Sequence, residues 1–142
     1  GGGGVATAYD VYRWAEMLRR GGELDGVRVL SPALLDLATR NHTGAEPNHL
    51  FDYMREHRGW DEFPAVLGLG FFLRGEGIFP TPFGVTTSPR TFGGLGAGST
   101  MFWVDPQREL VFVCLTTGLL EESRNFERLQ RLSDLVLSAL VG

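Results

Sequence analysis

A glycine-rich segment in the second half of the chain has the composition of a ligand-binding loop. Residues 92–103 read FGGLGAGSTMFW, and glycine lets a backbone approach a ligand or another segment closely. A phosphate-binding P-loop requires a lysine after its glycines, and the sequence contains no lysine. Gly94, Gly96 and Gly98 form G-x-G-x-G and lead into strand-like sequence, whereas a dinucleotide site needs G-x-G-x-x-G followed by a helix. The segment is therefore not predicted to bind a nucleotide.

The other reactive side chains show no catalytic or metal-binding pattern. His42, His49 and His57 are separated by seven and eight residues, so they do not form the i, i+4 ligand pairs of a helical metal site. No serine lies in G-x-S-x-G, the turn that exposes a nucleophile above a sheet. The lone Cys114 lies in an apolar run and is predicted to be a small core residue. These residues predict neither a metal site nor a cofactor, and they identify no nucleophile.

Composition and charge limit the partners. The net charge is −4 and the basic residues are scattered apart from Arg19 and Arg20, which argues against a nucleic acid partner. The longest apolar run, Leu110–Leu115, is far shorter than the roughly 20 residues that span a membrane. The sequence starts GGGGVATAYD, with no initiator methionine and no signal-peptide pattern, so we expect it to begin partway through a longer protein. The compartment stays open, with the cytoplasm slightly favoured.

The elements that must position these residues begin with two helices and a hairpin. Thr7 and Asp10 resemble a capping box, which predicts a helix from there to Gly21. The D-G pair in ELDGVRVL predicts a hairpin. A serine cap followed by proline predicts a second helix over Pro32–Arg40.

The rest of the chain combines a polar insertion with strands and a long helix. Residues 41–64 are predicted to be a polar insertion with one helix around Leu50–Arg58. LGLGFFL predicts a strand, and two apolar runs, Thr100–Val104 and Glu109–Thr116, predict an antiparallel pair of interior strands covered on both faces. A helix over residues 121–140 would pack across this sheet by an apolar stripe of Phe126, Leu129, Leu132, Val136 and Leu140. The 142 residues therefore predict one α+β domain in which an antiparallel sheet is covered by helices.

The order of these segments resembles a known superfamily. GGGGVATAYDVYRWAEMLRRGGELDGVRVLSP, LGLGFFL, FGGLGAGSTMFWVDPQRELVFVCLTT and the terminal helix are similar to the C-terminal part of the serine β-lactamase-related superfamily. That superfamily includes class C β-lactamases, D-Ala-D-Ala carboxypeptidases and family VIII carboxylesterases, so the resemblance implies part of a β-lactamase/transpeptidase-like fold. Its members use a serine in S-x-x-K, a tyrosine in Y-x-N or Y-x-S, and a third motif of the K-T-G type. The first two motifs do not occur here, which is expected of a C-terminal fragment that lacks the nucleophile segment.

Two segments compete for the third motif. The H-T-G sequence at residues 42–44 follows a helix and leads into the polar insertion, so we interpret it as a decoy. The better match aligns on the F-W pair at 102–103 and places Gly94 where relatives carry lysine, histidine or tryptophan. Gly94, Leu95 and Gly96 would then bind substrate, and the backbone amide of Ala97 would be an oxyanion donor. Glycine in place of a polar side chain favours a neutral ester or amide, or an unusual substrate, over a penicillin.

Two functions remain open at this point. In the first, the chain is the substrate-side part of a serine hydrolase that acts on a small-molecule ester or amide through an acyl-enzyme, together with an N-terminal segment of the same protein. In the second, it belongs to a non-catalytic binding or accessory module of the same fold. Under either, we expect the isolated chain to be inactive, because it lacks the lysine that activates the nucleophile. We also expect its exposed apolar surface to promote association into a homo-oligomer.

Overall fold

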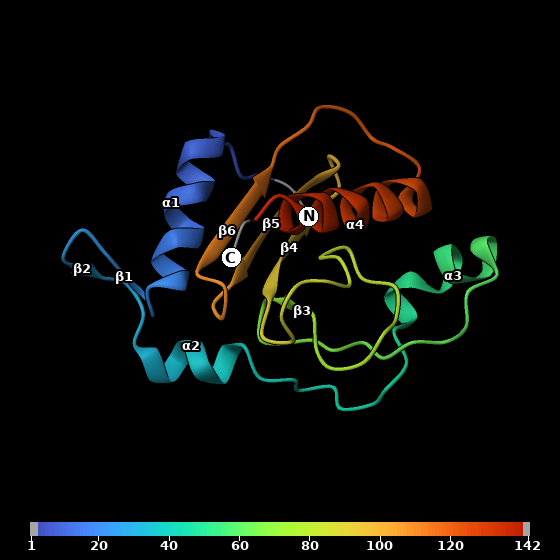
Figure 1. Ribbon diagram of the computed structural model, residues 1–142, viewed down its shortest axis with the longest axis horizontal. Coiled ribbons are helices and arrows are strands. Elements are labelled where there is room, and N and C mark those ends of the chain that lie inside the picture. Colours follow the sequence, from blue (N-terminus) through green and yellow to red (C-terminus); the bar gives the residue numbers. More distant parts are fainter. Residues whose placement is uncertain (1–2, 141–142) are drawn as a thin grey trace.

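The structure is a computed structural model that describes residues 3–140, and Figure 1 labels its elements. The first helix, α1 (Ala8–Arg19), begins at the predicted capping box. The Thr7 hydroxyl accepts a hydrogen bond from the Asp10 amide, and the Asp10 carboxylate accepts one from the Thr7 amide at 2.8 Å. The helix stops before Gly21, which has a φ of +73°. The predicted helix is therefore confirmed.

A hairpin and a short helix follow α1, as predicted. β1 (Glu23–Leu24) and β2 (Val27–Arg28) pair antiparallel around a turn in which Asp25 and Gly26 both have positive φ. This turn suits aspartate and glycine, which tolerate the left-handed conformation. α2 (Pro32–Ala38) starts at Ser31, whose hydroxyl accepts a hydrogen bond from the backbone of the first turn.

Four antiparallel strands form the main sheet in the order β3-β4-β5-β6. Their bounds are Phe72–Leu73 for β3, Phe92–Gly96 for β4, Thr100–Asp105 for β5 and Leu110–Cys114 for β6. The predicted antiparallel pair, β5 and β6, is confirmed. The prediction that both strands are interior is wrong for β6, which within residues 3–140 pairs with β5 alone and forms an edge. Apolar side chains on both faces of β6 reflect cover above and below the sheet, and they carry no information about a neighbour at its edge.

Helices cover the two faces of the sheet. On one face, Phe92 and Val104 pack in a buried cluster with Ala15 and Leu18 of α1. On the other face, Trp103 packs in a second cluster with residues of α4 (Glu122–Ser138). Because successive strand residues point to opposite faces, each strand contributes to both cores. The predicted α+β fold, with an antiparallel sheet covered by helices, is confirmed.

The C-terminal helix α4 begins with an acidic cap and ends slightly earlier than predicted. The Glu121 carboxylate accepts hydrogen bonds from the backbone amides of residues 123 and 124. The side-chain hydrogen bond from Ser123, which has the largest effect, and the backbone hydrogen bond from the same residue lower the pKa of Glu121 to about 2. Phe126 and Leu129 are buried as predicted, but Leu140 lies beyond the end of the helix and is exposed. The apolar stripe therefore does not extend to Leu140.

The segment between α2 and β3 contributes more to the core than its polar composition indicates. It contains the predicted helix, as a 3₁₀ turn (η1, His49–Phe51) followed by α3 (Asp52–Arg58). Its side chains Phe51, Met54 and Phe63 are all buried. Phe51 meets Phe126 of α4 edge-on, with ring centroids 5.3 Å apart. This segment therefore anchors itself against α4.

Two buried charged residues fix the irregular segment between β3 and β4. The Arg74 guanidinium donates hydrogen bonds to four backbone carbonyls of this segment. Asp105 is fully buried and accepts hydrogen bonds from the Ser88 amide at 2.8 Å and the Ser88 hydroxyl at 2.6 Å. Burial alone would raise the pKa of Asp105, but hydrogen bonds from Ser88 and Arg108 outweigh it and lower that pKa. The start of β4 is thus held against the end of β5.

Candidate active site

The glycine-rich segment forms a strand edge that is only partly covered. The predicted substrate-binding residues Gly94–Gly96 complete β4, and Ala97 is the first residue of the turn to β5. Strand β3 pairs with β4 only as far as Phe72, which lies opposite Gly93. Beyond that pair, the edge of β4 has no neighbouring strand within the described residues.

The register fixes which backbone groups face this open edge. Arg74 donates its backbone N–H to the Thr91 carbonyl at 2.8 Å, so Thr91 directs its backbone groups toward β3. Backbone groups alternate sides along an antiparallel strand, so Gly93 and Leu95 point the same way. The N–H and C=O of Leu95 therefore face the part of the edge that β3 leaves uncovered. Such an edge can pair with an extended ligand or donate an amide to an oxyanion.

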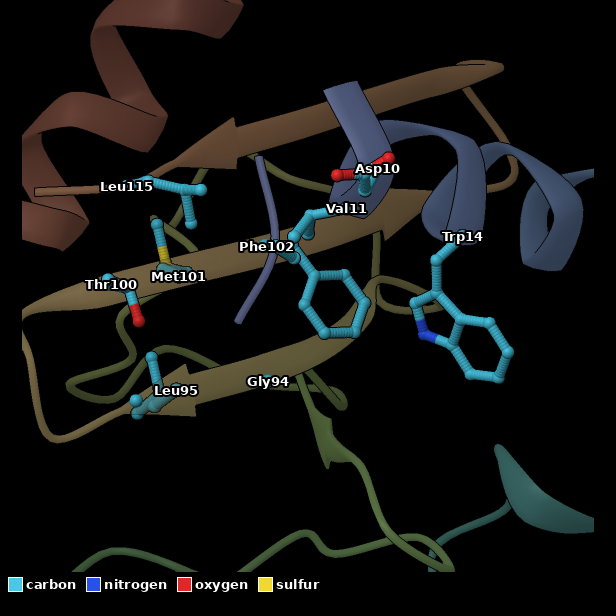
Figure 2. Close-up of a pocket in the computed structure, with 11 residues that line it drawn as sticks. Asp10, Val11, Trp14, Gly94, Leu95, Thr100, Met101, Phe102 and Leu115 are labelled. Carbon is cyan, nitrogen blue, oxygen red and sulfur yellow. The ribbon is translucent and has the colours of Figure 1, made fainter. Parts of the chain in front are cut away.

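Strand β5 explains why this segment is rich in glycine. A Cβ on Gly93 would lie 2.1 Å from the Phe102 carbonyl oxygen, and a Cβ on Gly94 would lie 2.9 Å from the Phe102 ring. A Cβ on Gly96 would lie 2.3 Å from the Thr100 hydroxyl. Figure 2 shows the Phe102 ring extending from β5 toward β4 beside Gly94. The bare backbone is required by the neighbouring strand, and the ring of Phe102 fills the space where the resemblance places a larger side chain.

The turn that carries Ala97 is tied to the end of the sheet and to α4. Ser99 has a φ of +61°, the left-handed conformation that closes a three-residue hairpin loop. Its carbonyl accepts hydrogen bonds from the Thr116 hydroxyl at 2.6 Å and from Arg128 Nη2 at 2.9 Å. Its hydroxyl accepts one from the Leu120 amide at 3.1 Å. These contacts hold the turn in one position.

A pocket lies on each face of β4 at the open edge. The first, here called the α1-side pocket, has a volume of about 420 Å³ and is drawn in Figure 2. The residues that line it include Trp14 of α1 and Met101 and Phe102 of β5. Gly94–Gly96 form its floor on β4.

The second, here called the α4-side pocket, has a volume of about 380 Å³ and includes Ala97. Its walls are aromatic and aliphatic side chains from three separate parts of the chain: Leu50, Phe51, Phe72, Leu120, Phe126 and Leu129. The Phe51 and Phe72 ring centroids are 6.0 Å apart, which makes part of this wall a stacked pair. Leu95 and Gly96 line both pockets, so this stretch of β4 separates them.

The charged groups at the two pockets are all acidic. Asp10 lines the α1-side pocket and Glu122 the α4-side pocket. The side-chain hydrogen bond from Thr7 lowers the pKa of Asp10, so this group is an anion at neutral pH. Among the described residues that line either pocket, there is no arginine, histidine, serine or cysteine. The arrangement can bind an apolar ligand and offer it backbone amides.

Sequence reasoning located the edge but missed the residues that shape its surroundings. Phe102 and Trp14 on one side, and Phe51 and Phe72 on the other, were not predicted to lie near Gly94. An aromatic residue eight positions after a glycine, across a short turn, is a signal that could have indicated the Gly94–Phe102 pair. The H-T-G sequence at 42–44 lies in a turn and lines neither pocket.

The described residues show neither a metal-binding cluster nor a membrane-spanning helix. Within residues 3–140, no group of three or more histidine, cysteine, aspartate or glutamate side chains is arranged to hold a metal ion. No helix in the described part of the chain is both long enough and apolar enough to cross a membrane.

The fold and the open edge define the class: an α+β protein in which helices enclose an antiparallel sheet and one inner strand presents a glycine-rich edge beside two pockets. The chain belongs to the β-lactamase family, because the family profile described as Beta-lactamase matches residues 1–136. The chain is 30% identical over 118 residues to the esterase/beta-lactamase LipL of Mycobacterium tuberculosis, a match that covers 82% of this chain and 23% of that protein.

A solved structure supports the same fold. The crystal structure of a β-lactamase from Mycobacterium bovis matches with a TM-score of 0.74 and 27% sequence identity. This match covers 94% of the chain described here and 44% of the solved chain. The chain thus spans about a quarter of the curated relative and less than half of the solved one.

Proposed function

We propose that this chain is the C-terminal part of a serine hydrolase that acts on small-molecule esters or amides through an acyl-enzyme. In this proposal, β4 is the substrate-side strand, Gly94, Leu95 and Gly96 contact the substrate, and the Ala97 amide donates to the oxyanion. The serine, with the lysine and tyrosine that activate it, comes from an N-terminal segment of the same protein outside this sequence.

The proposed reaction has two stages, acylation of the serine and hydrolysis of the acyl-serine. The serine oxygen bonds to the substrate carbonyl carbon as its proton passes to the lysine–tyrosine pair, and the carbonyl oxygen becomes an oxyanion that backbone amides stabilise. The oxyanion then collapses, the C–O or C–N bond breaks, and the leaving alcohol or amine takes the proton. Water hydrolyses the acyl-serine, which releases the acid and restores the serine.

One observation carries this proposal: the backbone of β4 is open at Leu95 and flanked on both faces by pockets that share Leu95 and Gly96. A planar ester that lies along this edge has a wall on each side and an amide beside its carbonyl. The tethered turn supports the same role, because an oxyanion donor has to be positioned before the reaction.

The test is turnover of p-nitrophenyl esters by the gene product that contains this chain, with and without a serine-reactive fluorophosphonate. We expect hydrolysis that the inhibitor abolishes, and no hydrolysis above a blank by the 142-residue chain alone. Upstream sequence without S-x-x-K, or turnover that the fluorophosphonate leaves unchanged, would contradict the proposal.

The alternative is a non-catalytic binding or accessory module of the same fold. It is favoured by Gly94, because the space beside this residue holds the Phe102 ring and no polar group. A gene product that binds esters at β4 without hydrolysing them would support this alternative.

A further inference from the structure

Each of the two pockets is lined by one acidic residue, and this charge affects which substrates the site accepts. We propose that the site selects uncharged, apolar esters and amides and rejects ligands that carry a carboxylate next to the scissile bond, with Glu122 as the main determinant. This inference rests on the proposed function for its chemistry, but the selectivity itself is a property of binding.

The α4-side pocket adjoins the stretch of backbone at which the reacting bond would lie. This pocket includes Leu95, Gly96 and Ala97, so a ligand whose carbonyl lies at the open edge extends one of its substituents into it. The volume of about 380 Å³ lies within the range of small-molecule sites, which is roughly 300–1,000 Å³. The occupant is therefore a whole substituent of the ligand.

The lining of that pocket is mostly apolar. Phe51, Phe72 and Phe126 form an aromatic wall, and Phe51 contacts both of the others. Phe126 and Phe51 are almost fully buried, so the wall is fixed by the core behind it. A polar or charged substituent would lose hydration against this wall and find few partners, whereas an apolar one gains burial.

The charge at that pocket disfavours an anionic substituent. Glu122 is the one charged residue among those that line the α4-side pocket, and it is exposed at the start of α4. Arg128 keeps its positive charge but does not line this pocket, and its guanidinium is directed to the Ser99 carbonyl and the Asn125 side chain. A ligand carboxylate in this pocket would therefore meet the like charge of Glu122 first. At a separation of about 5 Å and surface screening, that repulsion weakens binding by about tenfold.

The α1-side pocket leads to the same preference. Its charged lining residue is Asp10, which Thr7 holds in its ionised form by hydrogen bonds from both its amide and its hydroxyl. Trp14 and Phe102 supply apolar surface, as Figure 2 shows. A carboxylate is thus disfavoured whichever way the ligand lies along β4.

The test is a titration of the isotope-labelled gene product that contains this chain, with its nucleophilic serine replaced by alanine so that the ester is not hydrolysed, followed by amide chemical shifts. The two probes are N-phenylacetylglycine methyl ester and N-phenylacetylglycine, which differ only in whether the carboxylate is masked. We expect the ester to shift the amides of Leu95, Gly96 and Ala97 and to bind about tenfold more tightly than the acid. We expect the difference to shrink in 0.5 M salt, since the repulsion is screened.

Two variants separate the role of Glu122 from general charge. Glu122→Gln is expected to reduce the preference for the ester to about threefold or less. Glu62→Gln makes the same charge change at an exposed residue that lines neither pocket, and it is expected to leave the preference unchanged. Equal or tighter binding of the acid, an unchanged preference in Glu122→Gln, or no shift at these amides with either probe at millimolar concentration overturns the inference.

The outcome is separable from that of the proposed function. Serine-dependent turnover that prefers carboxylate-bearing substrates would overturn the selectivity and leave the hydrolase function in place. Preferred binding of the methyl ester by a gene product that does not hydrolyse it would support the selectivity and contradict the hydrolase function.

Discussion

Alanine at Gly93 and at Gly94 should have very different effects, although the two glycines are neighbours in one strand. The Cβ of Gly93→Ala would lie 2.1 Å from the Phe102 carbonyl oxygen and 2.8 Å from the Trp103 Cα, both backbone atoms of β5. The Cβ of Gly94→Ala would lie 2.9 Å from the Phe102 ring, with its next contacts at 3.5 Å and 3.6 Å in the same ring. A ring can rotate or shift, but a paired strand cannot move without losing hydrogen bonds.

The magnitudes follow from this difference. Replacing glycine with alanine stabilises a protein by roughly 0.4–1 kcal/mol where the site tolerates it, because the unfolded chain loses freedom. Overpacking costs about 1–3 kcal/mol, and each strained β4–β5 hydrogen bond adds about 1 kcal/mol. Gly93→Ala should therefore lower the free energy of unfolding by about 3 kcal/mol or more. Gly94→Ala should lower it by no more than about 2 kcal/mol.

A double-mutant cycle tests the cause as well as the size. Combining Gly94→Ala with Phe102→Leu removes the contacting ring, so the two changes together should cost about 1–2 kcal/mol less than the sum of the single changes. Phe102→Leu should not reduce the cost of Gly93→Ala in the same way, because the nearest contacts of that Cβ are backbone atoms of β5. The free energies are measured by urea unfolding followed by tryptophan fluorescence. Equal costs at the two glycines, or additive effects of Gly94→Ala and Phe102→Leu, would refute the reasoning.

Three further perturbations probe the turn, the buried acid and the outer edge of the sheet. Arg128→Gln removes a donor to the Ser99 carbonyl. It should lower the free energy of unfolding by about 1–2 kcal/mol and speed the hydrogen exchange of the turn amides, as measured by NMR. Asp105→Asn should cost about 2–4 kcal/mol in urea unfolding, because it weakens the hydrogen bonds that this buried carboxylate accepts from Ser88. Val113→Pro removes an N–H that faces away from β5, so it should reduce the self-association that we expect of the isolated chain in sedimentation at high concentration.

A control variant, a pH dependence and a contradicting result check these three outcomes in turn. Arg131→Gln changes an exposed arginine on the same helix and should leave the turn amides unaffected. The folded pKa of Asp105 is below its unfolded value of 3.8, so its contribution is complete above that pH and is lost as the pH falls through the folded pKa. Asp105→Asn should therefore flatten the acid side of the stability profile. A monomeric wild-type chain that does not bind a hydrophobic dye would contradict the expected association.

The features that sequence predicted well depend on residues close together in the chain. The Thr7–Asp10 capping box spans one helical turn, and the Asp25–Gly26 pair needs only its own backbone conformation. Residue patterns alone placed a strand from Thr100 onward, while the resemblance supplied the substrate-side strand before it. Glycine has a low strand propensity, so β4 is stabilised by what lies across from it, and that partner is not visible as a local pattern.

The site was less predictable because its walls come from distant segments. Phe51 and Phe126 meet in the α4-side pocket although 75 positions separate them in the chain. Hydrophobic periodicity shows that each is apolar, but it does not show which pockets they share. The edge position of β6 was missed for a different reason, because its apolar side chains report the cover on its two faces, whereas a neighbour at its edge would pair through the backbone.

The openness of the β4 edge depends on glycines that precede β3, far from the site in sequence. Leu67 pairs with Phe72, so the chain reverses between them and cannot continue alongside Leu95. This reversal needs Gly70, which has a φ of +79°, and Gly68, where a Cβ would lie 2.2 Å from the Ala38 carbonyl oxygen. Leu69 then donates its N–H to the same carbonyl at 2.8 Å, which ties the reversal to α2. The glycines of LGLG therefore limit β3 to Phe72–Leu73 and leave open the part of β4 that we propose as the substrate-side edge. The glycines of FGGLG let β4 lie closely against Phe102.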